Sequence, residues 1–274
     1  MQIGASASHL VVLSLSEHSH SPPMFDPNAA FTTHSLDQSH PRAHLRYVKQ
    51  DQSLYVVKSY ANNTEGGTAQ IERELEAVDG FEKLGVGVLK PLAGPFEHLR
   101  LEIDGGTTEF TSVLVFPFRD TPTLEKKLSG GDAAALEVVR EAGERIFHRH
   151  NLSTSLTTIH SDGAPHNIFS DWMWFDLGNP HRADELELAK SHEVWRFLAG
   201  TLAVYPAAEE EVIDAFTQGY TNQHALRLAA ERFGAQMPML RMFLQLPKYL
   251  RLRQGDTTQL VRLRTCRAIS KVLG

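Results

Sequence analysis

Two carboxylates and one carboxamide lie close together in the middle of the chain. Residues 159–169 read IHSDGAPHNIF, and residues 174–178 read WFDLG. A carboxylate on a short loop, such as Asp162, can accept the proton of an attacking hydroxyl group. An amide oxygen and a second carboxylate, here Asn167 and Asp176, are ligands that can hold Mg²⁺ against phosphate groups. Residues of these types could together carry out metal-assisted phosphoryl transfer, and the alternative is an ordinary polar turn built from Asp, Gly, Pro and Asn.

A lysine upstream has the orientation that phosphate binding requires. Residues 53–60 alternate in the manner of a strand, so that Leu54, Val56 and Lys58 share one face. A lysine on an apolar face can reach a phosphate group in a neighbouring cavity. The alternative, which is the more common case for a single lysine, is a side chain that extends from a strand end to solvent.

A glutamate on the next predicted element supplies a partner for this lysine. The pattern predicts a helix over residues 69–84, and Glu74 lies at the edge of its apolar stripe. A carboxylate at the border of a buried face needs a partner, and Lys58 on the preceding strand is the natural candidate. A solvated acidic helix face is the alternative, and it suits Glu72 and Glu76 better than Glu74.

The remaining elements place strands first and helices later, which favours the α+β class. We expect further strands at 30–36, 45–49, 86–92, 96–103 and 111–118, a hairpin at 167–175, and helices at 133–150, 183–204 and 207–220. The predicted organisation is an N-terminal extension (1–29), a sheet with one helix (30–118) and a mainly helical part (119–274).

Composition limits the classes of function. The chain has 274 residues, a formal net charge of −6, 42% hydrophobic and 22% charged residues, as expected of a soluble globular protein and not of a general nucleic-acid binder. The single cysteine, Cys266, excludes an internal disulfide and any multi-cysteine metal site, which fits a reducing cytoplasm. We find no apolar run long enough to span a membrane.

The last 34 residues are basic, with eight basic residues against one acidic residue. The basic residues are Arg241, Lys248, Arg251, Arg253, Arg262, Arg264, Arg267 and Lys271. Leucines and aromatic residues are mixed among them. Two interpretations remain open: contact with an anionic membrane surface or acidic substrate, and a terminal helical hairpin packed on an acidic body.

The complete set of positions resembles the protein-kinase-like superfamily over residues 30–220. The matching positions are Lys58, Glu74, His160, Asp162, Asn167 and Asp176. The chain has no Ala-Pro-Glu motif, and only a short segment separates Gly178 from the next predicted helix. It is therefore more similar to the aminoglycoside/choline phosphotransferases and the bacterial lipopolysaccharide-sugar (Kdo) kinases than to eukaryotic protein kinases.

The resemblance implies a bilobal fold, with a small antiparallel-sheet lobe and a mainly helical lobe, and it implies roles for individual residues. Asp162 would be the catalytic base for a hydroxyl group of a small molecule or glycan. Asn167 and Asp176 would hold Mg²⁺. Lys58, fixed by Glu74, would bind the α- and β-phosphates of ATP.

The resemblance also implies an adenine site at the end of one strand. The run Phe116-Pro117-Phe118 would lead into the hinge between the lobes, where backbone groups meet the base. Pro117 removes one backbone donor there.

One departure from the family pattern keeps other functions open. Residues 35–41 contain no glycine, although kinases place a glycine-rich loop between the first two strands to approach the phosphates. Side-chain donors such as Ser35, Ser39 or His40 would have to replace it. The alternatives are a non-catalytic, kinase-shaped binding module and an atypical Ser/Thr protein kinase.

Overall fold

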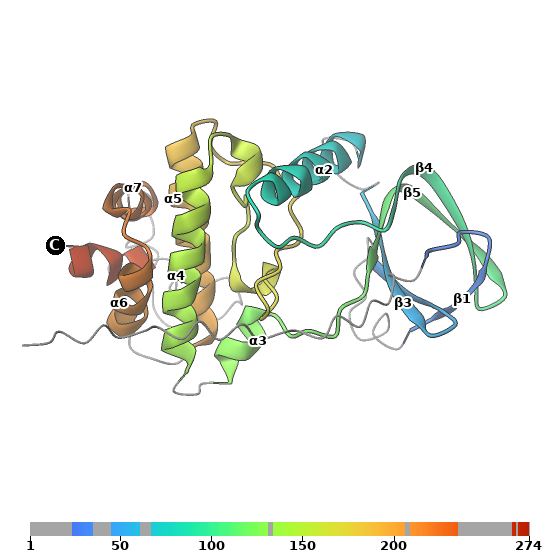
Figure 1. Cartoon of the computed structure of the whole chain (residues 1–274), viewed down its shortest axis with the longest axis horizontal. Helices are drawn as coiled ribbons and strands as arrows, with labels where there is room; N and C mark the ends of the chain where they lie inside the picture. The colour runs from blue at the N-terminus through green and yellow to red at the C-terminus, as the bar shows by residue number, and fades with distance from the viewer. Residues whose placement is uncertain are drawn as a thin grey trace, which may run out of the picture.

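A closed barrel of strands lies at one end of the molecule and a group of helices at the other, with helix α2 between them (Figure 1). The computed structural model describes residues 24–34, 45–60, 67–130, 134–205, 209–234, 265–266 and 268–273. The glycine-free segment and most of the basic C-terminal segment lie outside these ranges.

The barrel has the strand order β1-β2-β3-β5-β4. Its strands are β1 (Ala30–Thr33), β2 (Leu45–Gln50), β3 (Ser53–Ser59), β4 (Ala93–Ile103) and β5 (Gly106–Pro117). The pairings β1–β2, β2–β3, β3–β5 and β4–β5 are antiparallel. The pairing of β1 with β4 is parallel, and this pairing closes the barrel.

The barrel interior is filled by one apolar cluster. Phe31, Tyr55 and Val57 are almost fully buried there. Phe25, which precedes β1, packs against the rings of Phe31 and Tyr55 with centroids 5.5 and 5.3 Å away. The end of the predicted N-terminal extension therefore contributes to the core of the barrel.

The strand predicted over residues 86–92 does not form, and that prediction was wrong. The segment instead pairs with the later hairpin: Leu89 N–H donates to the Trp174 carbonyl (2.8 Å), and Trp174 N–H donates to the Gly87 carbonyl (3.0 Å). Pro91 has no backbone donor, which disfavours a place in a sheet interior. The predicted hairpin is present, because Phe169 N–H donates to the Met173 carbonyl at 2.9 Å.

Helix α2 (Gly67–Lys83) contacts both ends of the molecule with one buried face. Ile71 packs with the barrel residues Leu114 and Phe116, whereas Val78 and Phe81 belong to the core of the helical part. The predicted apolar stripe of this helix is therefore divided between two cores.

The helical part includes two helices that the sequence pattern did not predict, α3 and α7. Its helices are α3 (Leu124–Ser129), α4 (Ala135–Leu152), α5 (Leu186–Val204), α6 (Glu209–Gly219) and α7 (Gln223–Gly234), with 3-10 turns η1 (Leu156–Thr158) and η2 (Pro165–Asn167). The Thr123 side chain caps α3 by accepting a hydrogen bond from Lys126 N–H (3.4 Å).

The described end of the chain packs on these helices. Cys266 lies with Trp195 and Ala229, and Ile269 is fully buried in the main helical core. These residues therefore pack against the helical part, as the second interpretation of the basic C-terminal segment expects. Lys271 also forms an ion pair with Glu210 of α6. None of the helices in the described ranges has both the length and the apolar character needed to cross a bilayer.

We expect Phe81→Ala to lower the free energy of unfolding by about 3–5 kcal/mol. The Phe81 side chain is fully buried, and its ring meets those of Trp174 and His160 at centroid distances of 6.1 and 6.5 Å. Urea denaturation would measure the loss. Leu152→Ala is the control, because Leu152 is 44% exposed. Equal stability of the two variants would contradict this packing.

Candidate active site

The loop that carries Asp162 is fixed by a chain of hydrogen bonds centred on His160. Asp162 N–H donates to His160 Nδ1 (3.1 Å), and His160 Nε2–H donates to the Phe175 carbonyl (2.9 Å). These two bonds assign the proton of the neutral ring to Nε2. The Asn167 amide donates to the Asp162 carbonyl at 2.8 Å. His160 therefore ties the Asp162 loop to the residue that precedes Asp176.

A buried carboxylate on α5 also holds this loop in place. Glu193 has no exposed surface, and its Oε2 accepts His160 N–H (3.0 Å) and lies 2.9 Å from His150 Nε2. Arg149 donates to its other oxygen. Burial raises the pKa of Glu193, but Arg149 and the hydrogen bond from His150 outweigh burial and lower that pKa to about 2. A Cβ on Gly163 would lie 2.5 Å from Glu193 Cγ, so only glycine permits this approach.

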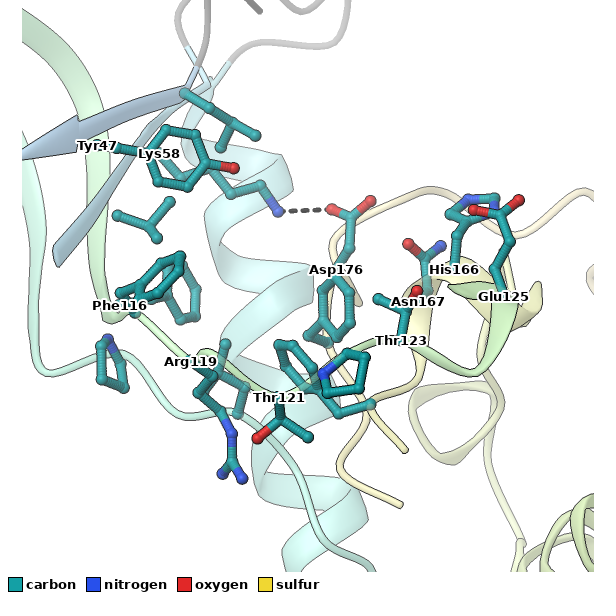
Figure 2. A pocket seen from close by; sticks show the side chains of 18 of the residues that line it. Tyr47, Lys58, Phe116, Arg119, Thr121, Thr123, Glu125, His166, Asn167 and Asp176 are labelled. Atoms are coloured by element: carbon teal, nitrogen blue, oxygen red, sulfur yellow. Dashed lines mark hydrogen bonds and ion pairs between the residues drawn. The ribbon is translucent and has the colours of Figure 1, made fainter. Parts of the chain in front are cut away.

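Lys58 lies between two carboxylates, as Figure 2 shows for one of them. Its Nζ is 2.8 Å from Glu74 Oε2 and 2.6 Å from Asp176 Oδ1. The predicted Lys58–Glu74 ion pair is therefore present. Glu74 also accepts hydrogen bonds from Tyr60 Oη (2.6 Å) and Leu177 N–H (3.3 Å). One buried carboxylate thus joins strand β3, helix α2 and the Asp-Leu-Gly segment.

The ionic state of this group follows from its charges. Burial lowers the pKa of Lys58, but the Glu74 and Asp176 carboxylates outweigh burial and raise that pKa well above its usual value. Burial raises the pKa of Asp176, and the Lys58 ammonium more than offsets it, so that the pKa of Asp176 is lowered. Lys58 and Asp176 are therefore both charged at neutral pH.

The Asp-Leu-Gly segment approaches α2 closely. Asp176 has a φ of +60°, in the left-handed region, and its Oδ2 accepts a hydrogen bond from the Asn179 amide at 3.4 Å. A Cβ on Gly178 would lie 2.7 Å from Glu74 Oε2 and 3.1 Å from the Gln70 carbonyl oxygen. Glycine is required there because any side chain would push α2 away from Asp176.

A cavity of about 620 Å³ opens beside these residues (Figure 2). Apolar side chains form one part of its wall, and Lys58, Glu74, Asn167 and Asp176 contribute charged and amide groups. The apolar and aromatic residues are Leu45, Tyr47, Val56, Leu89, Phe116, Pro117, Phe118, Pro122, Phe169 and Phe175. This combination of apolar walls and a few converging polar groups is typical of small-molecule sites.

The donor set in the cavity fits Mg²⁺. The Asn167 amide nitrogen is used by the Asp162 carbonyl, and Figure 2 shows the amide oxygen turned toward Asp176. The Asp176 side chain is 37% exposed. In the described ranges no three His, Cys, Asp or Glu side chains form a metal cluster. Two protein ligands, completed by phosphate and water, are the arrangement that Mg²⁺ favours in nucleotide sites.

The sequence-predicted residues divide into two groups in space. Six of them line the one cavity: Lys58, Glu74, Phe116, Phe118, Asn167 and Asp176. Asp162 lies next to this cavity but outside its lining, and its Oδ1 accepts a hydrogen bond from Arg196 Nε at 2.6 Å. The functional roles of all seven residues remain predictions.

Sequence reasoning missed Tyr60, Glu193 and Arg196. Their partners are distant in sequence, so no local pattern identifies the contacts that they make. The one available signal was the spacing of Glu193 and Arg196 on α5, because residues three apart share a helix face.

No protein-family model and no curated protein matches the sequence. The solved structures similar to this chain include two small-molecule kinases of the protein-kinase-like fold. One is spectinomycin phosphotransferase APH(9)-Ia in an AMP-bound complex, with 9% identity, a TM-score of 0.46, and coverage of 88% of this chain and 92% of that chain.

The other is amicoumacin kinase hAmiN in complex with AMP-PNP, Ca²⁺ and Ami, with 13% identity, a TM-score of 0.43 and 88% coverage of each chain. Both neighbours are of the kind that the sequence motifs resemble. At these identities the likeness assigns no activity to this chain.

We expect the free energy of unfolding to fall as the pH drops below about 6.5. Burial lowers the pKa of His150 and His160 from the usual 6.5. The unfolded chain therefore binds protons in this window that the folded chain does not bind, and stability is lost toward acid. Urea denaturation between pH 7.5 and 5 would measure the slope.

His150→Gln should reduce this slope, and His98→Gln should leave it unchanged because the His98 side chain is 76% exposed. A stability that does not vary over this range would contradict the assignment of two buried neutral histidines.

Proposed function

We propose that this chain is an ATP- and Mg²⁺-dependent phosphotransferase that acts on a hydroxyl group of a small molecule or glycan. The observation that carries the proposal is the position of Lys58, held between Glu74 and Asp176 at the wall of a cavity that Asn167 also lines. A cation, a metal-binding carboxylate and an amide oxygen then converge on one space.

The cavity suits a nucleotide in size and in wall chemistry. Its volume of about 620 Å³ lies within the range typical of ligand sites. Val56, Phe116 and Phe169 offer apolar surface for a base. Lys58 lies at the polar part and would bind the phosphates. In this arrangement the barrel and the helical part act as the two lobes of a kinase-like fold.

Asn167 and Asp176 would hold the metal ion, which neutralises phosphate charge when it is bound. The protein's own contribution is orientation. The Asn167 amide nitrogen is tied to the Asp162 carbonyl, so that its oxygen is available to the metal. Asp176 is held by Lys58 and Asn179, and its left-handed backbone directs the side chain into the cavity.

The reaction needs one proton transfer. The acceptor hydroxyl oxygen forms a bond to the γ-phosphorus, and the bond from that phosphorus to the bridging oxygen of ADP breaks. Asp162 takes the hydroxyl proton. It is suited to this because its loop is bonded to Asn167 on the cavity side and because its side chain remains 25% exposed.

A short segment after Gly178 favours a small acceptor. Helix α5 begins at Leu186, which leaves little chain for an activation loop or a peptide-docking surface. This favours the phosphotransferase over an atypical Ser/Thr protein kinase.

We expect Asp176→Ala to weaken Mg²⁺-dependent nucleotide binding by about tenfold or more, equivalent to ~1.4 kcal/mol. The substitution removes the only carboxylate proposed to bind the metal. Calorimetry with an ATP analogue and Mg²⁺ would measure the affinity. Asp79→Ala is the matched control, because Asp79 is an exposed residue of α2. Unchanged affinity in the Asp176 variant would overturn the metal assignment.

We expect Asp162→Asn to lower turnover by about 10²–10⁴ and to leave the affinity for Mg·ATP unchanged. Asparagine keeps the shape of the side chain but cannot take the proton, and Asp162 does not line the cavity. Turnover should be measured on a panel of sugars, amino alcohols and lipid-linked glycans, with ATP hydrolysis as a second readout.

Equal, measurable turnover in wild type and Asp162→Asn would show that Asp162 is not the base. Binding of Mg·ATP by a wild-type protein that turns over no acceptor and no ATP would favour the non-catalytic binding module.

A further inference from the structure

A cation from α5 holds the side chain proposed to be the base. Arg196 Nε donates to Asp162 Oδ1 at 2.6 Å, and Arg196 Nη2 contacts the same oxygen. Two nitrogens of the Arg196 guanidinium therefore converge on one oxygen of the Asp162 carboxylate. Such charge-assisted contacts fix orientation more firmly than neutral hydrogen bonds do.

The contact distinguishes the two oxygens of Asp162. Oδ1 is engaged by Arg196, whereas Oδ2 lies 4.0 Å from His166 Nε2, a longer separation than a hydrogen bond. His166 lines the cavity. Asp162 Oδ2, which Arg196 does not contact, therefore lies on the side of a residue that lines the cavity.

The same turn of α5 holds both the backbone and the side chain of the base. Glu193 binds His160 N–H, two residues before Asp162, and Arg196 follows Glu193 by three residues, on the same helix face. One helix therefore holds both the backbone of the loop and the side chain of Asp162. Catalytic groups need such support from a rigid element to keep a productive geometry.

The Arg196–Asp162 pair is accessible to solvent. Arg196 and Asp162 are 26% and 25% exposed, so their attraction is weaker than that of a fully buried pair at the same separation. By contrast, the neighbouring Arg149–Glu193 pair is almost completely buried. The contact of Arg196 with Asp162 Oδ1 instead fixes the orientation of the Asp162 carboxylate.

We propose that Arg196 is a positioning residue: it holds Asp162 so that Oδ2, and not Oδ1, takes the proton of the acceptor hydroxyl. This inference rests on the proposed phosphotransferase function. Without Arg196 the carboxylate rotates about its side-chain bonds, and the fraction of bound acceptor in a reactive arrangement falls. Arg196 does not line the cavity, so nucleotide binding is unaffected.

The test compares Arg196→Ala and Arg196→Lys with Arg227→Ala, a control at an exposed position on α7. We expect Arg196→Ala to lower kcat by about 10- to 100-fold, the loss typical of a misplaced catalytic group, with the affinity for Mg·ATP and the acceptor KM near wild type. Arg196→Lys should restore part of kcat, because one ammonium replaces two aligned donors. Arg227→Ala should match wild type.

A double-variant cycle separates positioning from a general structural effect. In the Asp162→Asn background, Arg196→Ala should cause no further loss of the residual turnover, since there is no base left to position. Independent, multiplicative losses would overturn the proposal. So would equal kcat in wild type and Arg196→Ala.

The two failures can be told apart. An active wild type with an unaffected Arg196→Ala variant overturns the positioning role alone. An inactive wild type that still binds Mg·ATP overturns the proposed phosphotransfer and the role of Arg196 with it. If Arg196→Ala does not fold, Arg196→Lys decides: a kcat equal to that of wild type overturns the proposal, and a lowered kcat with normal nucleotide affinity supports it.

Discussion

The buried carboxylate of Glu193 is the interaction on which the geometry of the candidate site depends. It is completely removed from solvent, and Arg149, His150 and the His160 backbone satisfy it. A buried charge is tolerated only while its partners remain in place, and loss of one partner typically costs several kcal/mol. If the loop before Asp162 moved away from α5, Glu193 would lose the hydrogen bond from His160 N–H and would become a buried charge with one partner fewer.

Glu74 is a second buried carboxylate, and it holds the part of the site that contains Lys58 and Asp176. It is 2% exposed and joins Lys58, Tyr60 and Leu177 N–H. Glu193 thus fixes the Asp162 loop on the helical part, and Glu74 fixes the Asp-Leu-Gly segment to α2 and β3. His160, which bonds to the Phe175 carbonyl, connects the two halves. Glu193 and Glu74, which have no proposed role in the chemical step, therefore set the positions of Asp162 and Asp176, which have one.

The sequence predicts those parts of this arrangement that depend on local periodicity. Lys58 was placed on an apolar strand face by its period of two, and Glu74 at the edge of a helical stripe, and the two residues meet as expected. The hairpin after Asn167 follows from the short separation to Asp176. These inferences succeed because one element or one short loop determines each of them.

The parts that failed depend on tertiary contacts. Residues 86–92 are apolar enough for a strand, but Gly87, Val88 and Leu89 pair with Trp174 of the later hairpin, and only Leu92 N–H bonds to the sheet, at the Val115 carbonyl. Glu193 and Arg196 reach the Asp162 loop only because α5 packs against it. The parallel pairing of β1 with β4 joins strands that are distant in sequence. No periodicity within one element encodes such contacts.

The divided packing of α2 has a mechanical consequence. Its second half, with Val78 and Phe81, shares a core with the helices, and the segment after it is joined by backbone bonds to the Trp174 hairpin. Its first half meets the barrel through Ile71. Helix α2 is therefore held by the helical part along its second half and by the barrel along its first half. Lys58 belongs to the barrel and Glu74 to α2, so any tilt of the barrel away from α2 would lengthen the Lys58–Glu74 ion pair.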